Sequence, residues 1–487
     1  MIKIDFLKQQ AKYPANDIGI AKLFIDSFSD RLIFCADTGV WYFWNDRYWE
    51  KDTRDGGKRH EMLKQLAVVV NKELFKIQDD EKLKAYQKIY SKLYSKNYRD
   101  TILRDAMSVS PITSSVFDKQ KFLFNCQNGT YNFITGEFRK HKKEDYLTDM
   151  STVVYDKNAD CPRFKQYLQE VMKGDQSKID YLMTIASYCL TGDTSQECFF
   201  ILYGETTRNG KGTFVETLLS LAGTYAQTVM PSTITRKNQN SGGNNSTPDL
   251  ADLKSARIAS VGEIEAGMLL DIALVKRMTG GNQIKARFLY ENNFSYVPQF
   301  KLLIDTNFLP KMTDDSIFKS DRIHLIEFTR HFELHERDMN LKSKLQSEKA
   351  GIFNLITEYY KLFQKQGFIM PQETIDTINK YQLDSNNVLA FTKTIYPDGT
   401  SYETQKDLYD AYVKWCNEEK LLPLAKKNFK NEIAKYGAIF IPEKRRLKNN
   451  LGLSENTFWV KGFSLTEPKK SVNTSDLIPI YDEDLPF

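Results

Sequence analysis

The chain has 487 residues, enough for about two to four domains, and its 41% hydrophobic content can build sizeable cores. It has no run of about 18 apolar residues and no apolar signal segment at its start, so we expect no membrane span and place the protein in the cytoplasm. Six scattered cysteines without CxxC spacing predict reduced core residues and exclude a paired-cysteine zinc module, and a net charge of +5 identifies no nucleic-acid partner by itself.

Residues 1–155 are predicted to form an α+β domain. The tryptophan-rich segment WYFWNDRYW (41–49) has aromatic residues on both sides of the polar NDR, which favours a small hairpin whose rings pack together rather than stack on bases. Residues 57–99 are rich in Lys, Arg and Tyr with helical periodicity, which predicts several amphipathic helices. Their basic face could contact nucleic acid, but a solvated face is the more common outcome.

A candidate phosphate loop lies in CFFILYGETTRNGKGT (198–213). An apolar strand ends at Gly204, a polar turn follows, and a helix starts near Lys211. Loop N–H groups and the positive helix end can face an anion while the Lys reaches the outer phosphates, which predicts nucleotide binding. A strand–loop–helix turn with an incidental Lys is the alternative. The predicted nucleotide-binding residues are Gly204, Thr206, Thr207, Arg208, Asn209, Gly210, Lys211, Gly212 and Thr213.

The spacing of this segment departs from the usual phosphate loop. Five residues, rather than four, separate Gly204 from Gly210. The residue after Lys211 is Gly212, so a hydroxyl ligand for Mg²⁺ comes from Thr213 or is absent.

Two later strands end in residues that suit the same site. The segment RIASVGEIE (257–265) ends with Glu263 and Glu265, and a carboxylate beside a phosphate loop can hold Mg²⁺ or orient the attacking water. The segment KLLIDTNFLP (301–310) carries Asn307, whose amide could position water against the terminal phosphate. Solvated acids on an edge strand and an Asn that starts a turn are the alternatives. Three such segments in order, each at a strand end, predict one ATP site.

Residues 385–466 are predicted to form a winged helix. Residues 405–416 and the segment KKNFKNEIAKYG give two helices, and AIFIP, EKRRLK and TFWVKGFSL give a strand, a wing and a strand. Winged helices bind duplex DNA or serve protein contacts, and both uses stay open. The residues that would face DNA phosphates are Lys427, Lys430, Arg445 and Arg446.

Residues 467–487 are predicted to form a polar linker and a flexible acidic tail that ends in YDEDLPF. An acidic run before a terminal Pro-Phe resembles the tail tip of bacterial single-stranded-DNA-binding proteins. Asp482–Phe487 could therefore dock on a host replication or repair protein that has a pocket for such tails. An ordinary solvated acidic terminus is the alternative.

The order of these segments resembles the ATPase core of superfamily 3 helicases, a branch of the AAA+ class. Within it the chain resembles the phage and plasmid primase-helicase family, which is related to the poxvirus primase-helicase. The resemblance covers most of the chain and implies a multidomain α/β fold with an AAA+ core over 156–370. The matching segments are TTRNGKGT, DLADLKSARIASVGEIEAG, VKRMTGGNQIKARFLY, LLIDTNFLP and SDRIHLIEF, with GVWYFWNDRYWE, NCQNGTYNF, CPRFKQYLQEVMKGD and DLYDAYVKWCNEE outside the core.

This resemblance implies an ATP- and Mg²⁺-dependent helicase for a phage, plasmid or mobile element in a bacterial host. Such a protein forms a homo-oligomeric ring, expected to be a hexamer, that translocates on single-stranded DNA and unwinds forked DNA. Lys211 would hold the outer phosphates, while Thr213 and Glu263 would hold Mg²⁺. Glu263, with Glu265, would activate water, and Asn307 would sense the terminal phosphate.

The resemblance also assigns a DNA-binding hairpin to residues 281–300, with Lys285, Arg287 and Tyr290 as phosphate partners and a stacking ring, and Lys276 one helix earlier. An ordinary hairpin with solvated charges is the alternative.

Arg322 is implied to reach a phosphate in a neighbouring subunit and to stabilise charge there, with Arg330 as the fallback. An ion pair of Arg322 with Asp321 or Asp315 is the alternative.

Two further classes of function stay open. One is a replication initiator that recognises and melts an origin, and the other is a non-motor AAA+ switch that binds ATP to assemble partners. The N-terminal part shows no polymerase-type acidic cluster and no zinc module, so we do not expect this chain alone to prime DNA synthesis.

Overall fold

The computed structural model describes residues 12–52, 57–236, 248–287, 294–312, 314–419, 421–449, 451–452 and 454–467. The chain divides into two compact units, and the second includes a short segment that interrupts the first in the sequence. Unit 1 is Met1–Leu309 with Arg322–Pro371, and unit 2 is Pro310–Asp321 with Gln372–Phe487. Within the described ranges, no helix is long and apolar enough to cross a membrane.

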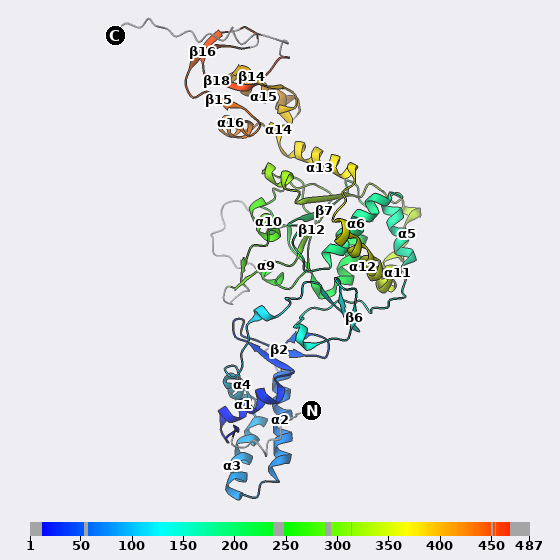
Figure 1. Cartoon of the computed structure of the whole chain (residues 1–487), viewed down its shortest axis with the longest axis vertical. Helices are drawn as coiled ribbons and strands as arrows, with labels where there is room; N and C mark the ends of the chain where they lie inside the picture. The colour runs from blue at the N-terminus through cyan, green and yellow to red at the C-terminus, as the bar shows by residue number, and fades with distance from the viewer. Residues whose placement is uncertain are drawn as a thin grey trace, which may run out of the picture. The chain divides into compact units, whose positions relative to one another are not determined.

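Unit 1 begins with a helical bundle and a small antiparallel sheet (Figure 1). The predicted aromatic hairpin is confirmed, because Trp44 pairs with Trp49 across its two strands and Trp49 is buried. The amphipathic helices expected over 57–99 are present as well. The elements are α1 (Asp17–Phe28), β1 (Leu32–Cys35), β2 (Val40–Trp44), β3 (Trp49–Lys51), α2 (Lys58–Leu74), α3 (Asp80–Ser91) and α4 (Lys96–Ala106).

A second small antiparallel sheet packs against the rest of unit 1 through aromatic rings. It comprises β4 (Leu123–Cys126), β5 (Gly129–Asn132) and β6 (Phe138–Arg139). The ring of Phe124 stacks on Tyr225 and Phe353 at centroid distances of 5.0 and 5.2 Å. Stacked rings at this separation add to the energy gained from burial. All three rings belong to one buried cluster that includes residues of the central sheet described next, so the two sheets share a core.

The centre of unit 1 is a five-stranded sheet in which every pair of neighbours is parallel. The central strands β7 and β12 are largely apolar and buried on both faces, as a parallel sheet covered by helices requires, while the short edge strand β8 is partly exposed. This confirms a mixed α/β class. In spatial order the strands are β13 (Ile323–Glu327), β7 (Phe199–Tyr203), β12 (Lys301–Thr306), β9 (Ile258–Gly262) and β8 (Ala226–Thr228).

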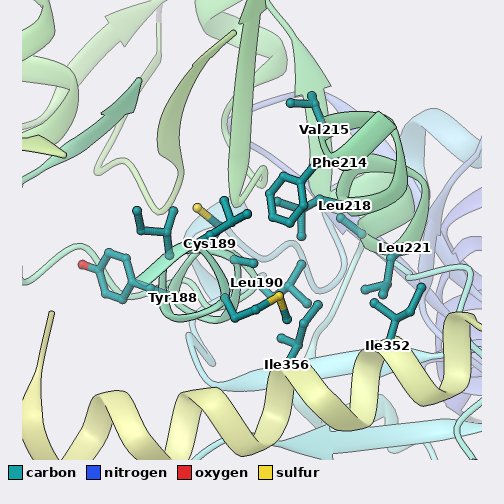
Figure 2. Close-up of a cluster of buried hydrophobic side chains, with 14 of the residues drawn as sticks. Tyr188, Cys189, Leu190, Phe214, Val215, Leu218, Leu221, Ile352 and Ile356 are labelled. Atoms are coloured by element: carbon teal, nitrogen blue, oxygen red, sulfur yellow. The ribbon is translucent and has the colours of Figure 1, made fainter. Parts of the chain in front are cut away.

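Helices cover this sheet, and α6 and α12 lie together (Figure 1). Figure 2 shows Phe214 and Leu218 of α7, Ile352 and Ile356 of α12 and Leu190 next to α6 in one buried apolar cluster. The helix that follows the candidate phosphate loop is therefore anchored in the main core. The helices are α5 (Pro162–Val171), α6 (Gln176–Cys189), α7 (Lys211–Ala222), α8 (Pro231–Ile234), α9 (Pro248–Asp252), α10 (Ile272–Thr279), α11 (Leu341–Ser347) and α12 (Lys349–Gln366).

Unit 2 is a small α/β unit with a core that includes Leu408, Tyr412, Phe429, Ile433 and Val460. Its sheet has the order β14-β18-β15, and β16 and β17 form a separate hairpin. The two helices and the later strands match the prediction, while the long β14 was not predicted. The elements are α13 (Gln372–Ser385), α14 (Asn387–Thr392), β14 (Tyr396–Thr404), α15 (Gln405–Glu418), α16 (Lys426–Ala434), β15 (Ile439–Phe440), β16 (Arg445–Lys448), β17 (Ser454–Thr457) and β18 (Trp459–Ser464).

Candidate nucleotide site

The candidate phosphate loop connects the end of β7 to the start of α7 and needs glycine at two points. A Cβ at Gly204 would lie 2.0 Å from Nδ2 of Asn209. Gly210 has φ of +90°, and a Cβ there would lie 2.5 Å from Cγ1 of Val171. Since the left-handed region disfavours side chains, Gly210 provides the sharp turn from which the helix starts at Lys211.

Asn209 braces the loop from inside and is only 4% exposed. Its Nδ2 donates to the carbonyl of Thr206 at 2.7 Å, and its Oδ1 accepts from the backbone N–H of Lys211 at 3.1 Å. Tyr167 of α5 donates from its hydroxyl to the carbonyl of Gly210 at 2.7 Å. These hydrogen bonds engage the carbonyls of Thr206 and Gly210 within the loop. Residues 205–208 remain exposed to solvent at the amino end of α7.

Lys211 is buried and makes its contacts with one strand. Its Nζ donates to the carbonyl of Thr306 and to Oδ1 of Asn307 at 2.8 Å, and it forms an ion pair with Oδ1 of Asp305 at 2.9 Å. Burial lowers the pKa of Lys211, and the bond to Asp305 opposes that shift. The structure thus brings the predicted pair Lys211 and Asn307 together and adds Asp305, which we did not predict.

Asp305 could have been found from the sequence, because it is an acid inside an otherwise apolar strand, two residues before Asn307. The position of the Asp305 side chain beside Lys211 depends on the pairing of β12 with β7 and on the start of α7, which no local pattern reveals.

The predicted acid Glu263 follows β9 at the same edge of the sheet. Its backbone N–H donates to the carbonyl of Asp305 at 3.2 Å, and its φ of +55° turns the chain away from the strand. Its side chain is exposed, as is that of Glu265 in the next turn. Glu263 therefore lies beside the carboxyl end of β12, and Glu265 follows it by two residues.

The remaining loop residues fit a magnesium-bound phosphate. Gly212 is exposed, and Thr213 lies half-buried in the first turn of α7. Among the described residues there is no cluster of three or more His, Cys, Asp or Glu side chains that could hold a metal alone. A magnesium ion on a nucleotide takes only one or two carboxylates beside phosphate oxygens, so the Thr213 hydroxyl with one carboxylate, that of Asp305 or that of Glu263, is a sufficient donor set.

Arg322 lies at the opposite end of the parallel strands, immediately before the first residue of β13. Its Nη1 donates to the carbonyl of Glu197 at 3.1 Å and to Oγ1 of Thr279 at 3.2 Å, and its Nη2 pairs with the Glu197 carboxylate. The ion pair is thus with Glu197 and not with the Asp321 or Asp315 that we considered. Because β7 and β13 run parallel, Arg322 lies away from the Lys211 of its own subunit.

The predicted DNA-binding residues lie in two places. In unit 1, β10 (Ile284–Ala286) and β11 (Phe294–Tyr296) pair as the two strands of the expected hairpin. Lys285 is exposed on β10, while Arg287 and Lys276 are half-buried and Tyr290 falls outside the described residues. In unit 2 the basic residues are exposed on α16 and β16, namely Lys427, Lys430, Arg445 and Arg446. The tail tip, Asp482–Phe487, also falls outside the described residues.

Two family models match the chain. The model described as "D5 N terminal like" matches residues 21–173, and the model described as "Poxvirus D5 protein-like" matches residues 383–463. The first match covers the helical bundle and both small sheets through to α5. The second covers most of unit 2.

Two curated viral proteins are similar over much of the chain. "Putative helicase L207/L206" of Acanthamoeba polyphaga mimivirus is 26% identical over 411 residues, which cover 76% of this chain and 42% of that protein. "Putative helicase 121R" of Invertebrate iridescent virus 3 is 20% identical over 338 residues, which cover 62% of this chain and 35% of that protein. The chain therefore spans less than half the length of these relatives.

A solved structure shares the fold. The apo structure of the NrS-1 C terminal region has a TM-score of 0.50, and the match covers 92% of this chain and 99% of that one. The sequence identity is 10%, so the likeness concerns the fold alone.

Proposed function

Because the chain belongs to the D5-like primase-helicase family, we propose that it is an ATP- and Mg²⁺-dependent DNA helicase that acts in the replication of a phage, plasmid or other mobile element. The ring it forms is a homo-oligomer, and a hexamer is the expected size. Its substrates are single-stranded and forked DNA.

One observation carries this proposal, namely the contacts of Lys211. A lysine at the first position of α7 lies within 2.9 Å of both Asp305 and Asn307, at the carboxyl end of the strand next to β7. A buried ammonium at a helix N-terminus, below an open loop of backbone N–H groups, suits the outer phosphates of a nucleotide. In the bound state Mg²⁺ would neutralise phosphate charge, held by the Thr213 hydroxyl and by one carboxylate at the carboxyl ends of these strands.

The protein groups around this position have separable roles. Lys211 holds the outer phosphates and offsets the charge that develops during phosphoryl transfer. Glu263, with Glu265 beside it, takes the proton of the attacking water, since its exposed carboxylate can reach solvent. Asn307 orients that water, and its amide is already fixed by Lys211.

The remaining features support an AAA+ core of the superfamily 3 type. The strand that leads into the phosphate loop lies between β12, which Asn307 directly follows, and β13, which Arg322 directly precedes. Arg322 lies at the end of the strands opposite its own Lys211, as a residue that completes the site of a neighbouring subunit would. The hairpin of β10 and β11 is the part that grips single-stranded DNA.

Unit 2 is proposed to be a winged helix that contacts DNA. Its elements follow the order two helices, strand, two helices, strand, hairpin and strand, and the basic side chains are exposed on α16 and β16. The tail tip, Asp482–Phe487, is proposed to dock on a host protein with a basic, apolar-lined pocket.

Strand separation by the purified chain tests the function. With ATP, Mg²⁺ and forked DNA, we expect displacement of one strand and ATP turnover that rises when DNA is added. ATP binding without either result would favour an assembly switch.

A replication initiator is the second candidate, favoured by the exposed basic residues of α16 and β16. Such a protein would protect a defined origin sequence in a footprint, whereas a loaded helicase would protect forked DNA of any sequence.

A further inference from the structure

Asp305 and Gly262 are paired residues of neighbouring parallel strands. Paired residues of adjacent strands lie on the same face of a sheet, so the missing side chain of Gly262 leaves room next to the Asp305 side chain. A Cβ at Gly262 would meet nothing within 4 Å. Asp305 is thus the acid on this face at the last shared register of β9 and β12, while Glu263 lies one residue beyond it.

The charges at this point make a cation necessary when phosphate binds. The side chains of Lys211 and Asp305 are 6% and 23% exposed and lie 2.9 Å apart. Phosphates that reach Lys211 must approach the Asp305 carboxylate, and like charges repel strongly where water is scarce. A divalent cation between the carboxylate and the phosphates converts that repulsion into attraction.

We propose that Asp305 supplies the protein carboxylate that holds the Mg²⁺ of bound ATP, and that Glu263 serves the attacking water instead of the metal. The proposal rests on the nucleotide site described above and divides its two acidic functions between β12 and the turn after β9. Glu263 suits the second function, because its exposed carboxylate lies beyond the strand end.

Equilibrium binding of a fluorescent, non-hydrolysable ATP analogue tests this division without any turnover. The dissociation constant is measured in excess Mg²⁺ and in EDTA for the full chain, for Asp305→Asn and for the matched variant Glu263→Gln. We expect Mg²⁺ to tighten binding by the native chain and by Glu263→Gln to the same degree. Asp305→Asn should lose about tenfold or more of that tightening, while its binding in EDTA is unchanged or stronger, because Lys211 loses its counter-ion.

Two results would overturn the proposal. Asp305→Asn could keep the full effect of Mg²⁺, for example by binding more tightly by the same factor in Mg²⁺ and in EDTA, in which case Asp305 is only a counter-ion of Lys211. Glu263→Gln could also lose the effect of Mg²⁺. If the native chain binds no nucleotide in either condition, the proposed function itself fails, which is a different result.

A change of metal preference tests the ligand directly and covers the case in which Asp305→Asn fails to fold. Thiolates favour soft metals over Mg²⁺, so Asp305→Cys should bind the analogue more tightly with Cd²⁺ than with Mg²⁺, and Glu263→Cys should not. The six native cysteines are buried, so the native chain serves as the control for background cadmium binding. Equal responses of the two cysteine variants would contradict the assignment.

Discussion

Replacing Arg322 by Ala tests the proposal that the ATP site is shared between subunits. Arg322 is bonded to Glu197 and Thr279 at the end of the strands opposite Lys211, so its loss leaves the phosphate loop of its own subunit intact. Partly exposed ion pairs contribute about 0–1 kcal/mol to folding, so the variant should remain folded. Nucleotide affinity should stay nearly normal. An arginine supplied to a phosphoryl-transfer site contributes about 10³–10⁵ in rate, which corresponds to about 4–7 kcal/mol of barrier, and turnover should fall accordingly.

Mixed assemblies give the decisive assay for this prediction. Subunits with Arg322→Ala are combined with subunits that carry Lys211→Ala, and ATP hydrolysis is measured across mixing ratios. An interface between an intact Lys211 and a neighbour's intact Arg322 should regain activity, although each variant alone is inactive. If the two kinds of subunit are shown to assemble together and no mixing ratio restores hydrolysis, the site is not shared in this way.

Three further predictions concern DNA, the tail and pH. Lys285→Ala with Arg287→Ala should keep basal ATP hydrolysis but lose strand separation and show a shallower salt dependence of single-strand binding; unchanged unwinding would return the hairpin to a structural role. Deletion of residues 482–487 should leave ATP hydrolysis and unwinding intact but reduce replication in the host; normal replication, with no host protein retained by a tail peptide, would contradict docking. Burial, and then the charge of Asp118, raises the pKa of Asp149 to about 7. The folded chain therefore keeps a proton that the unfolded chain releases above pH 4, and stability falls as pH rises toward 7. Asp149→Asn should melt higher than the native chain at pH 8 and at the same temperature at pH 4, and parallel melting curves across this range would contradict that pKa.

The strand–loop–helix geometry of the candidate phosphate loop could be predicted because its signals are local. A strand, glycines at Gly204 and Gly210 and a helix start are visible in one short segment, and the structure places Lys211 at the first residue of α7. The family resemblance is confirmed by the comparisons. It could be recognised from the sequence because it depends on short segments in a fixed order.

The contacts between distant segments could not be predicted. The ion pair between Lys211 and Asp305 joins residues 94 positions apart in the sequence (305 minus 211). The pairing of β12 with β7 brings them together. Arg322 pairs with Glu197, 125 residues away, rather than with the acids next to it in the chain. The long β14 was missed because its residues YPDGTSYET carry turn signals, and those signals are obeyed locally. Asp398 accepts from the backbone N–H groups of Thr400 and Ser401, and pairing with β18 resumes on either side of this irregularity.

Hydrolysis of ATP by Lys211→Ala is the most direct test of the central claim. The native chain, Lys211→Ala and a control with an exposed lysine, Lys342→Ala, are compared for ATP turnover with forked DNA and for thermal melting. We expect Lys211→Ala to lose at least about a hundredfold in turnover with its fold intact, because the ammonium meets the charge of the transferring phosphoryl group, while Lys342→Ala behaves as the native chain. Near-native turnover by Lys211→Ala with an unchanged melting curve would contradict the assignment of this loop as the ATP site.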